Sequence, residues 1–146
     1  MIEITTSGIK ELNADLKQLP DKLERRVILN LSQIAFDGVQ RGAGRHSKTG
    51  ALFQSVYNRS IPGGRSVGHD TSRAPYAQFV VFGTRPHVIR PKNKKALRWV
   101  GPGGGFSFAK KVNHPGYRGD DYFGQVKDNV LRIFSNIVND EFKGLL

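Results

Sequence analysis

Two amphipathic stretches, one near each end of the chain, constrain the fold more than any other feature of the sequence. Residues 122–142 show the strongest helical period, with apolar side chains at spacings of three and four. An aspartate directly before this stretch is expected to cap the helix. A second stripe covers residues 23–38 and follows Pro20, a residue suited to a first helical turn. Apolar positions at residues 9–19 extend this pattern upstream. The sequence therefore predicts an N-terminal helix kinked near Pro20 and a C-terminal helix.

The segment between these stretches is broken by glycine and proline into short alternating runs. Such runs predict strands. The expected strands are 2–5, 55–61, 65–69, 87–90, 95–100 and 106–112. We expect 87–90 and 95–100 to form a basic hairpin around a polar turn at 91–94, with 101–105 as an exposed glycine-rich loop. The order helix, sheet, helix predicts an α+β fold of one domain, 1–146, with a curved, mainly antiparallel sheet of about four or five strands and the C-terminal helix packed on it.

A short helix is expected within the sheet region, beginning at Pro75 and ending at Gly83. Its large apolar side chains are expected to form a buried face: Tyr76, Phe79, Val80 and Phe82. Phe106 and Phe108 are likewise expected in the core, and Trp99 is expected in the core or at an interface. An alternative for Trp99, Phe106 and Phe108 is base stacking in a nucleic-acid site.

The positive charge of the chain is confined to its middle. The formal net charge is +11, yet residues 41–118 hold fifteen Lys and Arg against the single acid Asp70. Such a block attracts polyanions or acidic protein surfaces. The candidate residues for binding a polyanion or partner are Lys92, Lys94, Lys95, Arg98, Lys110 and Lys111. A merely solvated basic surface is the alternative.

The sequence offers little for catalysis. It has no cysteine, no Gly-x-Ser-x-Gly and no His-Glu-x-x-His, and its four histidines lack metal-ligand spacing. We therefore expect that the protein is not an enzyme and that it binds no metal and no cofactor. His69-Asp70 is only a two-residue match to metal-dependent phosphohydrolases. The N-terminus lacks the features of a signal peptide, and no apolar run is long enough to span a membrane, so we expect synthesis in a cytoplasm and no membrane partner.

Four motifs occur in a fixed order along the chain. They are Lys48-Thr49-Gly50-Ala51-Leu52, Pro75-Tyr76-Ala77-Gln78-Phe79 continuing to Phe82-Gly83-Thr84, Ile89-Arg90-Pro91-Lys92 continuing to Trp99, and Val112-Asn113-His114-Pro115-Gly116. Together they resemble the small tail-component family of long-tailed bacteriophages, which includes neck, tail-completion and tail-terminator proteins. The motif residues expected to be structural or to lie at interfaces are Thr49, Gly50, Leu52, Pro75, Tyr76, Phe79, Phe82, Gly83, Thr84, Pro91, His114, Pro115 and Gly116.

The resemblance implies a structural virion protein without catalysis, located at the neck or tail junction and made in the host cytoplasm. It implies a hexameric ring of copies, contacts with other neck and tail proteins, and a lumen through which packaged DNA passes. Head–tail joining, tail completion and tail termination all stay open. Two other functions also stay open: a non-catalytic basic module that binds DNA or RNA, and a small basic ribonuclease.

Overall fold

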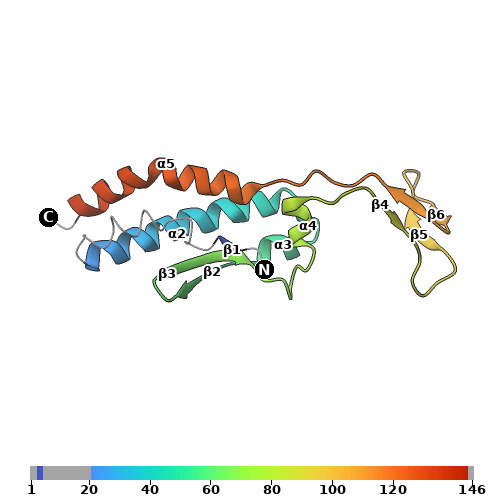
Figure 1. Ribbon diagram of the computed structural model, residues 1–146, viewed down its shortest axis with the longest axis horizontal. Helices are drawn as coiled ribbons and strands as arrows, with labels where there is room; N and C mark the ends of the chain where they lie inside the picture. Colours follow the sequence, from blue (N-terminus) through green and yellow to red (C-terminus); the bar gives the residue numbers. More distant parts are fainter. Residues whose placement is uncertain (1–2, 5–20, 145–146) are drawn as a thin grey trace.

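The computed structural model describes residues 3–4 and 21–144 and shows an elongated α+β protein (Figure 1). Two long helices, α2 and α5, account for much of its length. The elements, in chain order, are β1 (Glu3–Ile4), α2 (Asp21–Gly44), α3 (Ala51–Gln54), β2 (Val56–Ile61), β3 (Gly64–His69), α4 (Ala77–Phe82), β4 (His87–Ile89), β5 (Leu97–Val100), β6 (Phe106–Ala109), β7 (Val112–His114) and α5 (Tyr122–Lys143).

The body of the molecule has three layers. Helices α2 and α5 run antiparallel and side by side, and the β2–β3 hairpin lies against the other side of α2 (Figure 1). Strand β3 is central in this small sheet, because it pairs with both β1 and β2 in antiparallel register. The apolar stripe of α2 faces both neighbours, which is the burial that an amphipathic helix requires.

The core of the body forms two clusters along α2. One lies between the α2 and α5 helices and contains Leu23, Val27, Leu31 and Val130. The other lies where the end of α2, the start of α5, α3, α4 and the sheet converge, and its buried residues include Val39, Leu52, Val81 and Tyr122. Gly42 lets α2 approach α5 closely here, because a Cβ at this position would lie 2.5 Å from the Cβ and Cγ atoms of Tyr122.

An arm projects from the end of the body at which α4 lies (Figure 1). Residues 87–114 form it, as two short antiparallel ladders in series. Strand β4 pairs with β7, with His87 opposite His114, and strand β5 pairs with β6, with Leu97 opposite Ala109. The glycine-rich segment 101–105 closes the β5–β6 hairpin and lies at its tip, as predicted.

The sequence prediction of the α+β class and of the element order is confirmed. Helix α2 is described from Asp21 onward, and Asp121 caps α5 by accepting a 2.8 Å hydrogen bond from the Gly124 amide. The predicted strands at 55–61 and 65–69 correspond closely to β2 and β3. The predicted helix at residues 9–19, and with it the kink near Pro20, lies outside the described residues.

Four sequence predictions about strands and packing are wrong. The seven strands of the described residues form three small sheets and not one curved sheet. Helix α5 packs mainly along α2, and its first turn meets β3 where Tyr122 and Phe123 contact His69. Strands 87–90 and 95–100 do not form a hairpin, since each pairs with a strand later in the chain, and Lys110 and Lys111 lie between β6 and β7 and not on a strand.

The predicted buried face of α4 is wrong for its three aromatic residues, whereas Val80 is partly buried against the core. The small residues Ala77 and Val81 face the core, together with Ala74, whereas Tyr76, Phe79 and Phe82 are exposed. Phe82 has 71% of its surface exposed. The expectation that Phe106 and Phe108 lie in the core of the chain fails too, because both are more than half exposed.

Candidate interaction surface

The arm joins the body where two segments of the chain cross at very short range. Thr84 and Tyr117 form an antiparallel bridge there. Gly83, Gly116 and Gly119 all have positive φ, and a Cβ on any of them would collide with backbone atoms of the opposite segment. The crossing therefore depends on glycine at these positions, and it fixes the root of the arm to α4 and to the start of α5.

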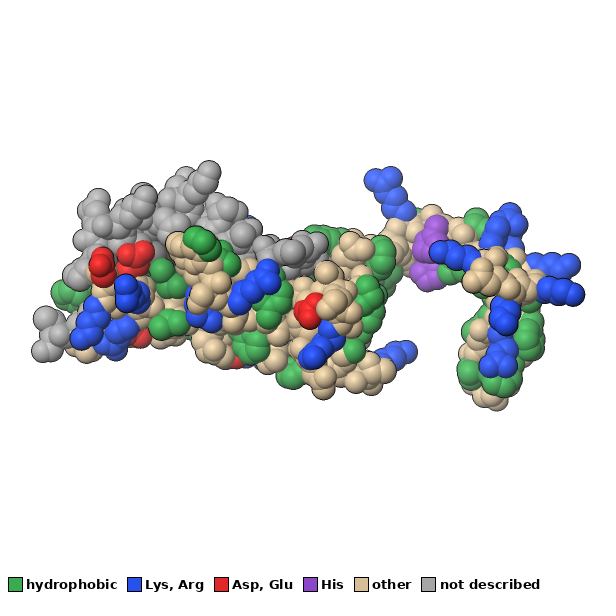
Figure 2. Space-filling view, turned by 90° about the horizontal axis from the view of Figure 1, so that it is seen from below, with side chains coloured by type: hydrophobic (Ala, Val, Ile, Leu, Met, Phe, Trp, Pro, Cys, Tyr) green, Lys and Arg blue, Asp and Glu red, His purple; other side chains and the backbone are tan. Residues whose placement is uncertain are grey.

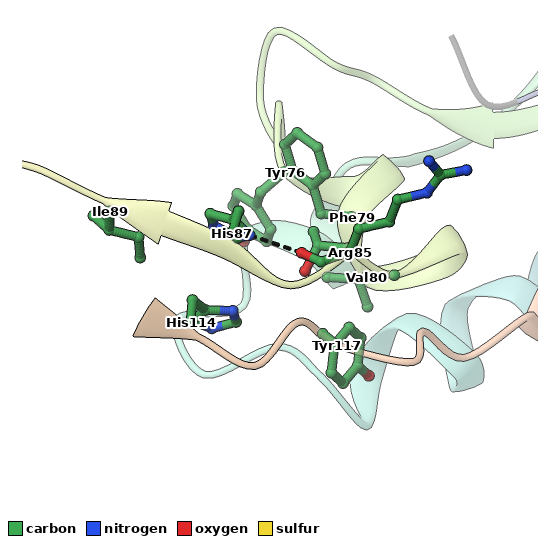
Figure 3. A pocket seen from close by; sticks show the side chains of 10 residues that line it. Tyr76, Phe79, Val80, Arg85, His87, Ile89, His114 and Tyr117 are labelled. Atoms are coloured by element: carbon green, nitrogen blue, oxygen red, sulfur yellow. Dashed lines mark hydrogen bonds between the residues drawn. The ribbon is translucent and has the colours of Figure 1, made fainter. Parts of the chain in front are cut away.

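An open apolar groove lies beside this crossing (Figure 3). Tyr76, directly before α4, and Phe79 and Val80 of α4 form one side, and Ile89 of β4 and Tyr117 help to form the rest. The groove has a volume of about 770 Å³. The aromatic residues that the sequence placed in a core thus line a surface instead.

Two histidines face each other across the β4–β7 ladder in the same groove (Figure 3). The ring centroids of His87 and His114 are 4.9 Å apart. His87 donates from Nδ1 to the Arg85 carbonyl oxygen at 2.8 Å, and His114 accepts at Nδ1 from the Gly116 amide at 3.0 Å. The second bond shapes the turn that follows β7, so His114 supports the root of the arm.

One face of the β5–β6 hairpin is apolar and uncovered in the described chain. Residues directly opposite in an antiparallel ladder share a face. Val100 pairs with Phe106, and Arg98 pairs with Phe108, so these four side chains lie together. Val100, Phe106 and Phe108 are exposed by 63%, 58% and 65%. We call these four residues the hairpin face.

Arg98 also contacts another member of the hairpin face. Its guanidinium carbon lies 4.2 Å from the centroid of the Phe106 ring, in a cation–π contact. Trp99 lies on the opposite side of the hairpin, paired with Ser107, and 43% of its surface is exposed. A surface of aromatic residues and arginine is typical of the centre of a protein interface.

A separate group of cations lies where the two ladders of the arm meet. The β4–β7 ladder ends at Ile89 opposite Val112, and the β5–β6 ladder begins at Leu97 opposite Ala109. Residues 90–96 and 110–111 therefore connect the same two ladders. Their Lys and Arg side chains are all exposed, and we call them the cationic junction: Arg90, Lys92, Lys94, Lys95, Lys110 and Lys111.

The structure brings together some of the motif residues and separates others. Tyr76, Phe79, Gly83, Thr84 and His114 all line the groove at the root of the arm, with Pro115 and Gly116 in the segment that crosses Gly83–Thr84. Thr49 and Gly50 precede α3, whose Leu52 is fully buried in the core. Pro91 belongs to the loop of the cationic junction, and Pro75 precedes α4.

His69, which the sequence offered with Asp70 as a weak match to a metal site, is buried in the core of the body. His69 is 1% exposed, and Ser55, His69 and Tyr122 form a buried hydrogen-bonded chain. The Ser55 hydroxyl donates to the Leu52 carbonyl oxygen at 2.7 Å, so it accepts from His69 Nδ1 at 2.7 Å, and Tyr122 then donates its hydroxyl to His69 Nε2 at 2.8 Å. Burial lowers the pKa of His69 to about 4 and raises the pKa of Tyr122. The neutral imidazole ties β3 to α5 and α3.

Asp120 forms an ionic cluster near the root of the arm. Its Oδ2 accepts from His46 Nε2 at 2.8 Å and from Arg45 Nη2 at 2.9 Å. The hydrogen bond from His46, followed by the bond from Arg45, lowers the pKa of the Asp120 carboxyl group. This cluster links the end of α2 to the start of α5, and like the His69 chain it stabilises the body from which the arm projects.

The described part of the chain contains no group of three or more His, Cys, Asp or Glu side chains that could hold a metal ion. Nor does any helix among the described residues have the length and apolarity needed to cross a bilayer. What the structure adds to the sequence-based site is the hairpin face and the groove. The signal for the hairpin face was the alternation of Arg98, Val100, Phe106 and Phe108, two residues apart on each strand.

Comparisons of the chain with protein-family models, with curated proteins and with solved structures found no match.

Proposed function

We propose that this chain is a non-enzymatic structural subunit of the neck or tail of a long-tailed bacteriophage, and that it joins copies of itself through its arm. The observation that supports this proposal best is the uncovered hairpin face. A two-stranded hairpin is marginally stable by itself in water and usually needs a further packing surface. The described body does not supply one, because the hairpin stands away from it across an open hollow (Figure 2).

The groove at the root of the arm supports the same proposal. It presents a second apolar surface, rich in aromatic side chains, beside a rigid crossing of two chain segments. A subunit that inserts its hairpin face into an apolar surface of a neighbour would bury both. Each copy then gives one arm and receives one, a head-to-tail arrangement that closes into a ring when the rotation between copies permits it.

The four sequence motifs give this assembly its biological setting. Two of them, at residues 75–84 and 112–116, meet at the root of the arm although they lie far apart in the sequence. Motifs that shape the root of the arm support a role for the arm in assembly. The hexameric ring, the neighbouring neck and tail proteins and the virion location belong to this proposal.

The proposal is tested in two steps. Native mass spectrometry of the full chain, over a range of concentrations, should detect a closed oligomer, either alone or in the presence of assembled tails. Deleting the gene from the phage or prophage that encodes it should then produce particles with unjoined heads and tails or with tails of defective ends, as seen by electron microscopy. Fully assembled, infectious particles after deletion would contradict the proposal.

A further inference from the structure

The cationic junction has no neutralising partner in the described chain. None of its six side chains makes an ion pair or a cation–π contact among residues 21–144. The sequence contains no Asp or Glu between Asp70 and Asp120, so no acid is available from the arm itself. Figure 2 shows Lys and Arg side chains extending from the arm in several directions. Like charges held this close repel one another until an anionic partner binds.

We infer that the cationic junction binds the phosphate backbone of duplex DNA without regard to sequence. Duplex DNA is the partner that the composition of the junction favours. Five of its six members are lysines, which act as mobile point charges and impose no fixed geometry on the phosphate. Protein interfaces, by contrast, are depleted in lysine and enriched in arginine and aromatic residues.

The hairpin face and the cationic junction therefore differ in the chemistry of their side chains. The hairpin face holds aromatic residues and Arg98, and it suits a protein partner. The cationic junction contains no aromatic side chain that could stack on an unpaired base. Contact through phosphates alone favours the nucleic acid of highest charge density, which is the duplex, with one negative charge per about 1.7 Å of helix axis.

The inference goes beyond the proposed assembly role and does not depend on it. Fluorescence anisotropy with a labelled 25-base-pair duplex of random sequence measures binding of the full chain at several salt concentrations. If the six cations each contact a phosphate, the slope of log K against log salt is about −5, and binding weakens about a thousandfold between 50 and 200 mM salt. The variant Lys92→Gln, Lys94→Gln, Lys95→Gln should reduce the magnitude of the slope by about 2.7, since each contact contributes about 0.9.

Two control variants keep this test specific. Lys22→Gln, Lys127→Gln, Lys143→Gln removes the same charge from exposed helix positions of the body and should leave the slope unchanged. Lys92→Arg, Lys94→Arg, Lys95→Arg keeps the charge of the junction and should retain binding. An equal loss in the body variant would overturn the assignment to the junction, and so would an unchanged slope in the junction Gln variant.

Other probes distinguish duplex DNA from other anionic partners. Single-stranded DNA and RNA of the same length should bind more weakly than the duplex, and tighter binding of either would overturn the duplex assignment. Polyglutamate at equal charge concentration should compete poorly, whereas competition equal to that of DNA would point to an acidic protein surface and overturn the inference. If the junction Gln variant loses DNA binding but keeps its oligomers, the DNA proposal is supported and the assembly proposal is untouched, so the two proposals can fail independently.

Discussion

Thr84 and Tyr117 exchange both of their backbone hydrogen bonds, at 2.7 Å from the Thr84 amide and 2.9 Å from the Tyr117 amide. This pair is the point at which the outgoing and returning segments of the arm are fastened to each other. Every residue of the hairpin face and of the cationic junction lies beyond it. The orientation of both surfaces relative to the body therefore depends on this crossing.

Replacing Gly83 with alanine should damage the crossing. Gly83 has φ 76° and ψ −172°, a conformation that is essentially restricted to glycine and costs other residues about 1–3 kcal/mol. A Cβ there would also collide with the Tyr117 carbonyl oxygen. We expect urea unfolding, followed by circular dichroism, to show a loss of at least about 2 kcal/mol. Gly103→Ala, in the hairpin loop with nothing within 4 Å of the new Cβ, is the control and should change stability little.

Gly42→Ala should destabilise the body although alanine is the better helix former. The gain from helix propensity is about 1 kcal/mol, but the new methyl group would overlap the Tyr122 side chain at 2.5 Å, and overpacking costs about 1–3 kcal/mol. The matched control is Gly44→Ala near the end of the same helix, where the new Cβ would lie 3.6 Å from Phe53. Thermal unfolding should rank Gly44→Ala at or above the parent and Gly42→Ala below it.

The sequence predicted the long helices well and the orientation of α4 poorly, for one physical reason. A stripe repeated over twenty residues specifies which side of a helix is buried, as for Val130 in α5. Helix α4 has only six residues and apolar side chains on two sides. Hydrophobicity alone favours burial of Phe79 and Phe82, but Ala77 and Val81 are the residues that face the core cluster containing Tyr122.

The pairing of the arm strands was beyond the reach of local sequence patterns. Residues 87–89 could pair either with the next strand or with a later one, and both choices keep the alternation. The glycine-rich segment 101–105 closes a tight hairpin between β5 and β6, which leaves β4 to pair with β7. The separate sites of the arm follow from this topology, because the junction exists only where two ladders meet in series.

Replacing Tyr122 with phenylalanine should cost about 1–3 kcal/mol of stability. The Tyr122 hydroxyl is the donor to His69 Nε2, and its removal leaves a buried acceptor without a partner. Tyr117→Phe, at an exposed position of the groove, should change the free energy of unfolding by less than about 0.5 kcal/mol. Equal changes in the free energy of unfolding for the two substitutions would show that the hydrogen-bonded chain through His69 adds no specific stability to the body.

Acid should destabilise the chain through His69. Its pKa falls from an ordinary value of 6.5 to about 4 on folding, so the unfolded chain binds the proton more tightly. Stability from this group is fully present above pH 6.5 and is lost as the pH falls toward 4, by on the order of 3 kcal/mol in total. His69→Gln should lower stability at pH 7 and flatten its pH dependence within this window, as measured by urea unfolding at a series of pH values. A parent chain equally stable at pH 7 and pH 4.5 would contradict the prediction.

The last prediction concerns the hairpin face and separates assembly from folding. Phe106→Ser with Phe108→Ser removes two exposed rings that contribute little to the core of the described chain, so the melting temperature should stay within a few degrees of the parent value. The oligomer should nevertheless be lost in native mass spectrometry, because aromatic anchors at the centre of an interface commonly contribute about 2 kcal/mol or more each. Phe106→Leu with Phe108→Leu keeps an apolar surface and should retain much of the assembly. If the serine variant assembles like the parent chain, the hairpin face is not the contact between copies.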